Sequence, residues 1–281
     1  MPQPPKVSIL MLTYNRPQMI GRAIRSAREQ SLTDWELIIV QDGASLETEG
    51  LLKEWLAKDE RIRYFRRGKV GSIAEASNFG LATARGAYMA ILDDDDYWSD
   101  PDKLQRQVEF LDRNPDYVAC GGGYVVVDQH DRERGKFLKP EKDAAIRERA
   151  LLANPVVNST ALFRRIVNGE PVMYDVSMKQ FADWDFWLTM GARGKLYNFP
   201  MHLTYYALWD GGSSFKAQKE NGRAALRIIH KHRHEYRGFA PALLLAWGYY
   251  CYACLPVRVR RMSYASLSAL KKAMASSGGN S

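Results

Sequence analysis

Short apolar runs and amphipathic segments alternate along the first 110 residues of the chain. The runs Val7 to Leu12, Trp35 to Val40 and Ala87 to Leu92 have the length and composition of buried strands, and Arg61 to Phe65 is typical of a further extended segment. The helical segments between them are one opened by Pro17, with the apolar face Ile20, Ala23, Ile24 and Ala27, then Leu51 to Leu56 and Ser72 to Ala84. This alternation predicts an α/β fold with a Rossmann-like, mostly parallel central sheet flanked by helices.

The pattern becomes mixed after residue 115. Asp100-Pro101-Asp102 predicts a helix start and a helix that ends near Asn114. The segments expected beyond it are a strand at Tyr124 to Asp128, a polar insertion at Gln129 to Lys142, an apolar stretch at Asn158 to Phe163 and a largely buried helix from Phe181. We therefore expect residues 1–115 and 116–220 to form two halves of one domain, followed by a helical appendage at 221–281.

Polar side chains follow three of the predicted strands at the point where each strand ends. They are Thr13-Tyr14-Asn15-Arg16, Asp42-Gly43-Ala44-Ser45 and Asp93 to Asp96. Ligands of open parallel sheets sit beyond the carboxyl ends of the strands. We therefore expect these three clusters to converge on one edge of the sheet and to form the functional site.

Composition narrows the class of protein. Of 281 residues, 46% are hydrophobic and 26% charged, which is typical of a folded globular chain, and the net charge of +8 favours anionic partners. The chain carries no nucleic-acid-binding motif, so we expect no nucleic-acid partner. Three cysteines do not make a disulfide framework and the first residues lack the apolar core of a signal peptide, which together predict a cytoplasmic protein.

Four consecutive aspartates, Asp93 to Asp96, follow an apolar strand directly. A solvated turn would need only one or two acids, whereas four carboxylates repel one another strongly and favour a neutralising cation. Carboxylate oxygens prefer hard ions such as Mg²⁺ or Mn²⁺, and a site with few protein ligands leaves positions open for substrate phosphates. The run lacks the glycine and the distal glutamate of an EF-hand loop.

Three segments resemble the conserved pieces of family 2 glycosyltransferases, which have the GT-A fold. They are Val7 to Arg16, similar to the first strand and nucleotide loop, Trp35 to Gly43, similar to the second strand with its base-contacting aspartate, and Ala87 to Asp96, similar to the strand with the Asp-x-Asp metal motif. The resemblance covers roughly residues 6 to 215. It implies nucleotide contacts from Thr13, Tyr14, Asn15, Arg16, Asp42, Asn78, Asp93 and Asp95, and a metal, Mn²⁺ or Mg²⁺, held by Asp95 and Asp96. Asp96 is predicted as the direct ligand, although spacing does not decide between these two.

The same resemblance implies a catalytic base distant in sequence from the metal. Asp183 matches the second acid of the family's Glu-Asp motif, and Asp185 is the second choice because it faces another side of the helix. We expect Trp184, Phe186 and Trp187 to desolvate the base partly and to stack on sugar. The chain departs from the family at Ala182, which replaces the first acid of the motif, and at Trp209 to Ser214, where many relatives have a histidine followed by Gly-Ser.

These features predict an inverting transferase that moves one sugar from a nucleoside diphosphate donor, preferably a UDP-sugar, to a glycan or lipid-linked acceptor. The processive Gln-x-x-Arg-Trp motif is absent, which favours single additions. Bacterial surface polysaccharide or glycoconjugate synthesis is the expected setting. Because of Ala182 and Trp209, a degenerate chain that binds the nucleotide sugar or a membrane without turnover is the alternative. A dehydrogenase is disfavoured because the glycines at 121–123 lie too late in the chain and lack the required spacing.

The C-terminal appendage contains an uncharged stretch from Phe239 to Val257 with basic residues on both sides. Aromatic side chains with flanking cations favour a segment that lies on an anionic inner membrane face. A buried core helix and a membrane-spanning helix are the two alternatives. The alternating run His230 to His234 predicts a solvated basic face.

Overall fold

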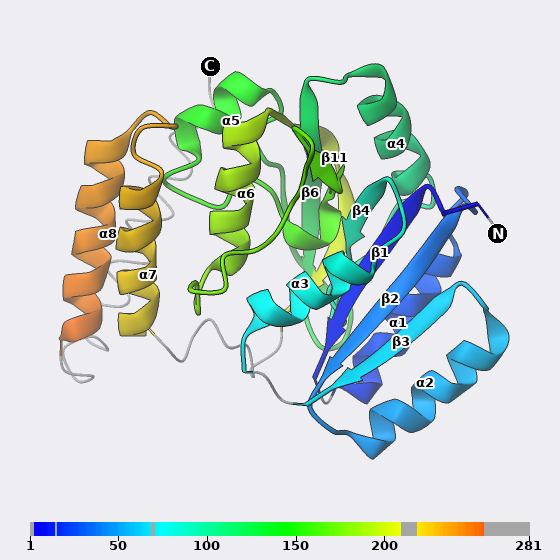
Figure 1. Cartoon of the computed structure of the whole chain (residues 1–281). Helices are drawn as coiled ribbons and strands as arrows, with labels where there is room; N and C mark the ends of the chain where they lie inside the picture. Colours follow the sequence, from blue (N-terminus) through cyan, green and yellow to red (C-terminus); the bar gives the residue numbers. More distant parts are fainter. Residues whose placement is uncertain (1–2, 15, 69–70, 209–217, 256–281) are drawn as a thin grey trace.

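The computed structural model describes residues 3–14, 16–68, 71–208 and 218–255. Within them, one curled nine-stranded sheet forms the centre, with strand order β3-β2-β1-β4-β8-β6-β11-β5 and with β7 beside β6. Figure 1 shows helices on both faces of this sheet and the pair α7 and α8 standing together at one end of the molecule. The α/β fold expected from the sequence is confirmed.

The N-terminal half is a regular parallel unit, because β1 pairs in parallel with both β2 and β4, and β2 pairs in parallel with β3. Strands and helices alternate strictly along this half of the chain. The elements are β1 (Val7–Thr13), α1 (Pro17–Arg28), β2 (Trp35–Asp42), α2 (Leu46–Lys58), β3 (Ile62–Arg67), α3 (Ile73–Thr83) and β4 (Tyr88–Ile91).

The second half mixes directions, because β8 runs antiparallel to β4 and β6 while β11 runs parallel to β6. The strands are β5 (Tyr97–Trp98), β6 (Tyr117–Val127), β7 (Glu133–Phe137), β8 (Leu162–Arg164), β9 (Ile166–Val167), β10 (Glu170–Pro171) and β11 (Lys195–Ala207). The helices are α4 (Lys103–Arg113), α5 (Asp143–Arg149), the 3₁₀ turn η1 (Asn158–Thr160), α6 (Ala182–Arg193), α7 (Gln218–Lys231) and α8 (Phe239–Cys254).

Side chains of alternate strand residues separate two apolar cores, one on each face of the sheet. Ile9 and Met11 of β1 pack with the apolar face of α1 and with α4, whereas Leu10 packs on the other face with α3 and the core that contains α6. The period of two along a strand produces this division. The predicted apolar face of α1, Ile20, Ala23, Ile24 and Ala27, is fully buried.

A buried carboxylate fixes the relative positions of the parallel strands. Glu36 of β2 accepts hydrogen bonds from the Ser8 hydroxyl at 2.6 Å and from the Arg63 guanidinium at 2.7 Å, and it also pairs with Arg85 just before β4. Burial raises the pKa of Glu36, but these donors outweigh it and hold that pKa below its usual value. The charge therefore joins β1, β2, β3 and the approach to β4 at the end of the sheet opposite to the polar strand ends.

Two expectations are corrected by the fold, those for the polar insertion and for the histidine run. The polar insertion after residue 128 contains β7, an exposed strand that pairs with β6, because its backbone groups complete a hairpin. His232 is 4% exposed rather than solvated, since its ring nitrogen lies 2.9 Å from a carboxylate oxygen of Asp185. The stretch that begins at Phe239 forms the helix α8, which packs on the core through Phe239 and Leu243 and exposes Leu244 and Trp247.

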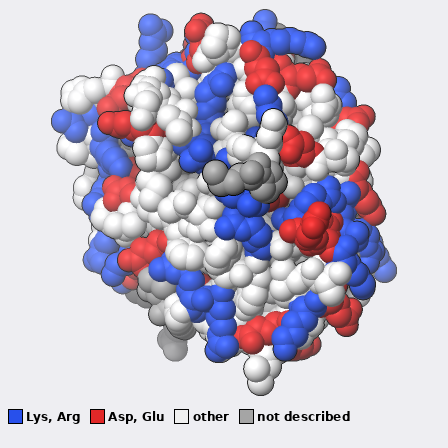
Figure 2. All heavy atoms as spheres, turned by 45° about the vertical axis from the view of Figure 1, so that its right-hand side comes forward, with Lys and Arg blue, Asp and Glu red and all other residues white. Residues whose placement is uncertain are grey.

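Charge is distributed rather than concentrated on the face drawn in Figure 2, where Lys and Arg side chains lie interspersed with Asp and Glu. Among the described residues, no helix is long and apolar enough to cross a membrane.

Candidate active site

The ends of three neighbouring strands carry the polar groups predicted for the site. Thr13 ends β1 and is buried, Asp42 ends β2 and is half-buried, and Asp93 follows β4 closely. Because β2, β1 and β4 are parallel neighbours, these ends meet at one edge of the sheet. Tyr14 is 53% exposed beside them, and Asn15 lies outside the described residues.

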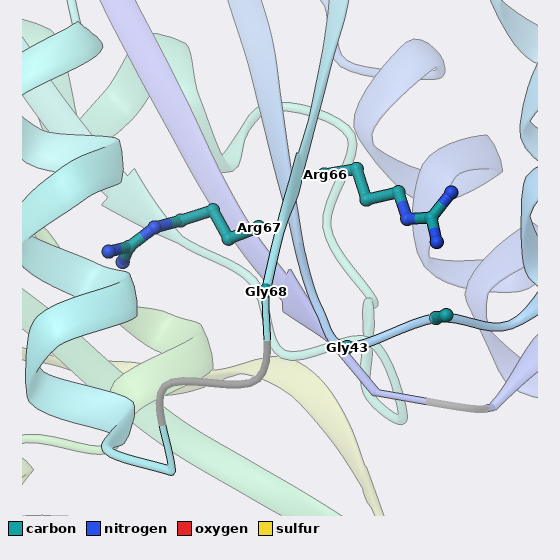
Figure 3. Close-up of a pocket in the computed structure, with 5 residues that line it drawn as sticks. Gly43, Arg66, Arg67 and Gly68 are labelled. Carbon is teal, nitrogen blue, oxygen red and sulfur yellow. The ribbon is translucent and has the colours of Figure 1, made fainter.

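A pocket of about 450 Å³ opens beside the end of β2. Gly43 and Ala44 line it together with Arg66, Arg67 and Gly68 at the end of β3. Gly43 has a φ of 87°, a conformation that side chains other than glycine rarely adopt, so this residue type is required at the turn. Figure 3 shows Arg66 and Arg67 extending to opposite sides of their strand.

Sequence reasoning missed these two arginines. Arg66 lies 3.3 Å from the carboxylate of Glu49, whereas Arg67 donates to the backbone oxygen of Glu75 at 3.0 Å and covers the Phe79 ring. Their signal was available, because they directly follow the predicted segment Arg61 to Phe65, and the sheet-edge rule applies to its end as well.

The aspartate run alternates in accessibility. Asp94 and Asp96 are 3% and 2% exposed, whereas Asp93 and Asp95 are half-buried. The Arg16 guanidinium lies 2.9 Å from Asp94 and 2.6 Å from Asp95, so it neutralises part of the negative charge. Arg16, which was predicted to contact the nucleotide, thus forms ion pairs with two of the four aspartates.

The turn η1 forms hydrogen bonds with the aspartate run. The Ser159 hydroxyl donates to Asp96 at 2.5 Å and accepts from the backbone N–H of Asp93 at 3.2 Å. The other carboxylate oxygen of Asp96 accepts from the backbone N–H of Ala207 at 3.2 Å. Both oxygens of Asp96 are therefore engaged by protein donors, while one oxygen of Asp95 pairs with Arg16. Sequence reasoning did not find Ser159, since an isolated serine carries no signal.

Crowding and burial oppose ionisation of the run. Burial raises the pKa of Asp93 to about 7, with further contributions from the charges of Asp95, Asp94 and Asp183. Burial also raises the pKa of Asp94 to about 6, although Arg16 and Thr13 lower it. The pKa of Asp96 is raised well above its usual range by burial and by the charges of Asp93 and Asp95. A divalent cation would relieve this repulsion.

The donors present fit a hard divalent cation. Carboxylate oxygens of the run lie beside Asn158, whose amide donates to Asp93 at 3.3 Å while its own side-chain oxygen is buried and accepts no hydrogen bond from the described residues. Within the described part of the chain, no group of three or more His, Cys, Asp or Glu side chains is arranged as a complete metal site. The arrangement thus suits an ion that takes few protein ligands and completes its shell with phosphate oxygens.

Asp183, predicted as the catalytic base, lies within electrostatic reach of the aspartate run. It lies in the first turn of α6, and its carboxylate accepts a hydrogen bond from the Asn154 amide at 2.7 Å. Burial raises the pKa of Asp183, and its charge in turn contributes to the raised pKa of Asp93, so the two carboxylates lie within electrostatic reach. Phe181, just before the helix, has a φ of 55°, a strained conformation for this residue type.

Asp185 has a different role from the one considered for it. It is 1% exposed and lies 2.8 Å from Lys231 and 2.9 Å from His232, so it binds α6 to α7. The expected sugar stacking by the neighbouring aromatic rings is also wrong, because Phe186 and Trp187 are 2% and 0% exposed and belong to the core.

Asn78 contacts protein rather than open space. Its amide donates to the Tyr174 carbonyl at 2.9 Å and accepts from the Tyr174 N–H at 2.7 Å. Burial raises the pKa of the Tyr174 phenol well above its usual value, and the charges of Asp183 and Asp93 add to this shift. Asn78 therefore positions a residue that lies within electrostatic reach of both carboxylates.

Comparison with known proteins agrees with this arrangement. The model of glycosyl transferase family 2 matches residues 8–170, which include all three strand ends and the aspartate run. The chain belongs to glycosyl transferase family 2. It is 30% identical over 192 residues to TuaG of Bacillus subtilis strain 168, a protein assigned provisionally as a teichuronic acid biosynthesis glycosyltransferase, and the match covers 68% of this chain and 73% of TuaG.

Solved structures show that the fold is GT-A. The S. aureus TarS 1-349 structure in complex with UDP-GlcNAc matches with a TM-score of 0.63 and 16% identity, covering 82% of this chain and 69% of that one. The mannosyltransferase PcManGT from Pyrobaculum calidifontis, in complex with GDP-Man and Mn²⁺, matches with a TM-score of 0.62 and 15% identity. That match covers 98% of this family 2 chain and 81% of the mannosyltransferase.

Proposed function

We propose that this family 2 chain is an inverting, non-processive glycosyltransferase that moves one sugar from a nucleoside diphosphate sugar to a glycan or lipid-linked acceptor. The observation that carries the proposal is that the half-buried Asp93 and Asp95 follow the end of a parallel strand, with Asp183 of α6 within electrostatic reach of Asp93. An acidic group for the donor and a distant carboxylate for the acceptor are the two parts that such a transfer needs.

In the proposed reaction, the Asp183 carboxylate takes the proton from an acceptor hydroxyl. The resulting oxygen forms a bond to the anomeric carbon of the donor sugar while the bond from that carbon to the diphosphate oxygen breaks, so the anomeric configuration inverts. Asn154, which donates to Asp183, orients the carboxylate. The raised pKa of Asp183 suits proton abstraction near neutral pH, because a more basic carboxylate accepts a proton more readily.

For the donor, we propose that Tyr14 and Asp42 flank the base and that Thr13, Arg16 and the pocket beside Gly43 complete the nucleotide site. UDP-sugars are the favoured donors, since TarS binds UDP-GlcNAc, while PcManGT binds GDP-Man. Asp93 would contact the ribose. The arginines at the end of β3 supply positive charge close to the pocket.

We propose Asp95 as the direct ligand of Mn²⁺ or Mg²⁺, with Asp96 holding the aspartate run in place through its hydrogen bonds to Ser159 and Ala207. When bound, such a cation neutralises charge on the departing diphosphate. Arg16, which contacts Asp94 and Asp95, lies where it can turn toward the same phosphates. The segment Trp209 to Ser214, where many relatives have a histidine followed by Gly-Ser, lies outside the described residues.

The test is thermal unfolding of the full chain with UDP, GDP, UDP-GlcNAc or GDP-mannose, each with and without Mn²⁺. At a ligand concentration of 100 times Kd the stabilisation is about 2.7 kcal/mol, which raises Tm by on the order of 5 °C for a chain of this size. We expect this rise with a uridine nucleotide and only with metal. A metal-dependent rise without slow donor hydrolysis would identify the degenerate alternative, and no rise with any nucleotide would contradict the proposal.

We further propose that α8 places the enzyme on an anionic membrane at its cytoplasmic face, where lipid-linked acceptors and surface polysaccharide precursors reside. The small side chains Ala242, Ala246 and Ala253 face the protein, whereas Leu244 and Trp247 are 72% and 49% exposed. Gly222 of α7 permits this close packing, since a Cβ there would come within 3.0 Å of the Tyr250 ring. The outward face of α8 is therefore apolar along its length and is available to a lipid surface.

Basic side chains next to this face support an anionic membrane. Arg233 and Arg237 lie on the turn that leads from α7 into α8. Cations near a membrane surface contribute about 1 kcal/mol each with acidic lipids. Interfacial binding through this helix therefore combines apolar burial with charge attraction.

Substitution of both Leu244→Glu and Trp247→Glu should release the protein from vesicles that contain phosphatidylglycerol, with at least a tenfold drop in the bound fraction. Sedimentation with the vesicles measures this fraction, and an unchanged Tm confirms that the variant folds. The matched control is Leu46→Glu with Ile73→Glu, two residues that are 83% and 67% exposed on other helices. Equal vesicle binding by both double variants would exclude α8 as the anchor.

A further inference from the structure

An exposed group of aromatic rings extends the active site along the sheet. Tyr124 of β6 lies opposite Phe137 of β7, and their rings stack with centroids 5.3 Å apart. On the other side of Tyr124, the ring of Tyr206 from β11 lies 5.9 Å away at an angle of 65°. These three rings, the aromatic platform, occupy one face of three adjacent strands.

The aromatic platform is not part of a core. Phe137 and Tyr206 are 49% and 41% exposed, and Tyr124 is half-buried between them. The opposite face of the same strands is packed, because Val125 and Val127 form a small cluster there with Ala207. An exposed aromatic face on a strand whose other face is already buried has no packing requirement that explains it.

Gly135 and the spacing of the strands determine where the three rings lie. A Cβ at Gly135 would come within 3.0 Å of the Phe137 ring, so the absence of a side chain lets this ring lie against the strand. Adjacent strands are about 4.8 Å apart, so the aromatic platform extends about 10 Å across the sheet. This span suits a short saccharide better than a single sugar ring.

The aromatic platform begins beside the aspartate run. Tyr206 precedes Ala207, whose backbone N–H donates to Asp96 at 3.2 Å. Burial raises the pKa of the Tyr206 phenol, and the charges of Asp96, Asp93 and Asp95 raise it further. The ring is therefore within electrostatic reach of the groups proposed to hold the donor.

We propose that Tyr206, Tyr124 and Phe137 form an acceptor subsite that binds a saccharide by stacking of its apolar C–H faces on the rings. This assignment rests on the proposed function and specifies the acceptor as a carbohydrate chain. Aromatic rings offer a large contact area with little loss of side-chain entropy, and the tyrosine hydroxyls can bind sugar hydroxyls. The terminal sugar, placed next to Tyr206, would present its hydroxyl to Asp183 beside the donor. The aromatic platform thus takes the role first expected of the aromatic residues on α6.

The experiment measures binding of glucose-, galactose-, mannose- and N-acetylglucosamine-containing trisaccharides to the full chain by saturation-transfer NMR in the presence of UDP and the diamagnetic ion Mg²⁺. We expect at least one trisaccharide to bind, and Phe137→Ala or Tyr206→Ala to weaken that binding by about fivefold each. Phe137→Tyr should restore it, because the ring is retained. Tyr205→Ala is the matched control, since Tyr205 precedes Tyr206 on β11 and stacks on Tyr97 at the opposite face of the sheet.

The result separates this subsite from the proposed reaction. The Mn²⁺-dependent rise in Tm with UDP should be the same in all four variants, and its absence from the unmodified chain would contradict the proposed function instead. With that rise intact, trisaccharide binding that survives both alanine substitutions would overturn the subsite. Failure of every trisaccharide to bind the unmodified chain would overturn it as well.

Discussion

Asp183→Asn should lower the rate of sugar transfer by about 10²–10⁴-fold while nucleotide binding stays within a factor of about three of the unmodified chain. Asparagine keeps the size of the side chain but accepts no proton from an acceptor hydroxyl. The donor groups Asp93 and Asp95 lie on a different element, so the Mn²⁺-dependent rise in Tm with UDP should persist. Single-turnover transfer and thermal unfolding measure the two effects separately.

The pH profile gives an independent readout of the same carboxylate. Burial raises the pKa of Asp183, so its reactive form is lost as pH falls through a value above that of an ordinary aspartate. The acidic limb of kcat/KM should follow this ionisation and should disappear in Asp183→Asn.

Asp175→Asn provides the matched control for this substitution, because Asp175 lies just before α6 and pairs with Lys231 at the surface. It should change neither the rate nor the pH profile by more than a factor of about two. Full transfer activity in Asp183→Asn would remove Asp183 as the base.

Asp95→Asn should abolish the metal-dependent part of the stabilisation by UDP, reducing a rise on the order of 5 °C to less than about 1 °C. Asp96→Asn should fold, because asparagine resembles the protonated form that burial favours at this position. Loss of a group that supports a metal ligand typically weakens metal binding by about 10–100-fold, so Asp96→Asn should need more Mn²⁺ for the same rise in Tm.

The control for both variants is Asp102→Asn, an exposed acid at the start of α4. It should leave the Mn²⁺ titration unchanged. If Asp96→Asn abolished the metal effect while Asp95→Asn kept it, the direct ligand would be Asp96, as the sequence resemblance alone predicts.

The parallel half of the fold was predictable because its signals are local. Apolar runs bounded by turn residues mark β1, β2 and β4, and the periodic face of α1 is wholly buried as expected. The site edge follows from the same reasoning, since parallel neighbours end together. The aspartate run was visible because like charges at a strand end have few structural purposes.

The second half was harder because its strands are short or irregular and pair over long distances. β8 has three residues, and its partners are β4 and β6, about 45 to 75 positions earlier in the chain. The strand β7 escaped notice because its side chains are mostly polar and exposed, so it carries no alternation. No local sequence pattern marks such a strand, which is recognised only by its backbone pairing with β6.

The sequence by itself determined the fold class, the family and the edge at which Thr13, Asp42 and the aspartate run gather, because these depend on periodicity and strand order. Only the tertiary structure decided which of the four carboxylates are buried, since Asp94 and Asp96 are 3% and 2% exposed and Asp96 is held by η1 and β11. It likewise separated Asp183 from Asp185, which are two residues apart but bind Asn154 and the end of α7 respectively. Burial and hydrogen bonding between distant segments decide these roles, and no local pattern in a single sequence encodes them.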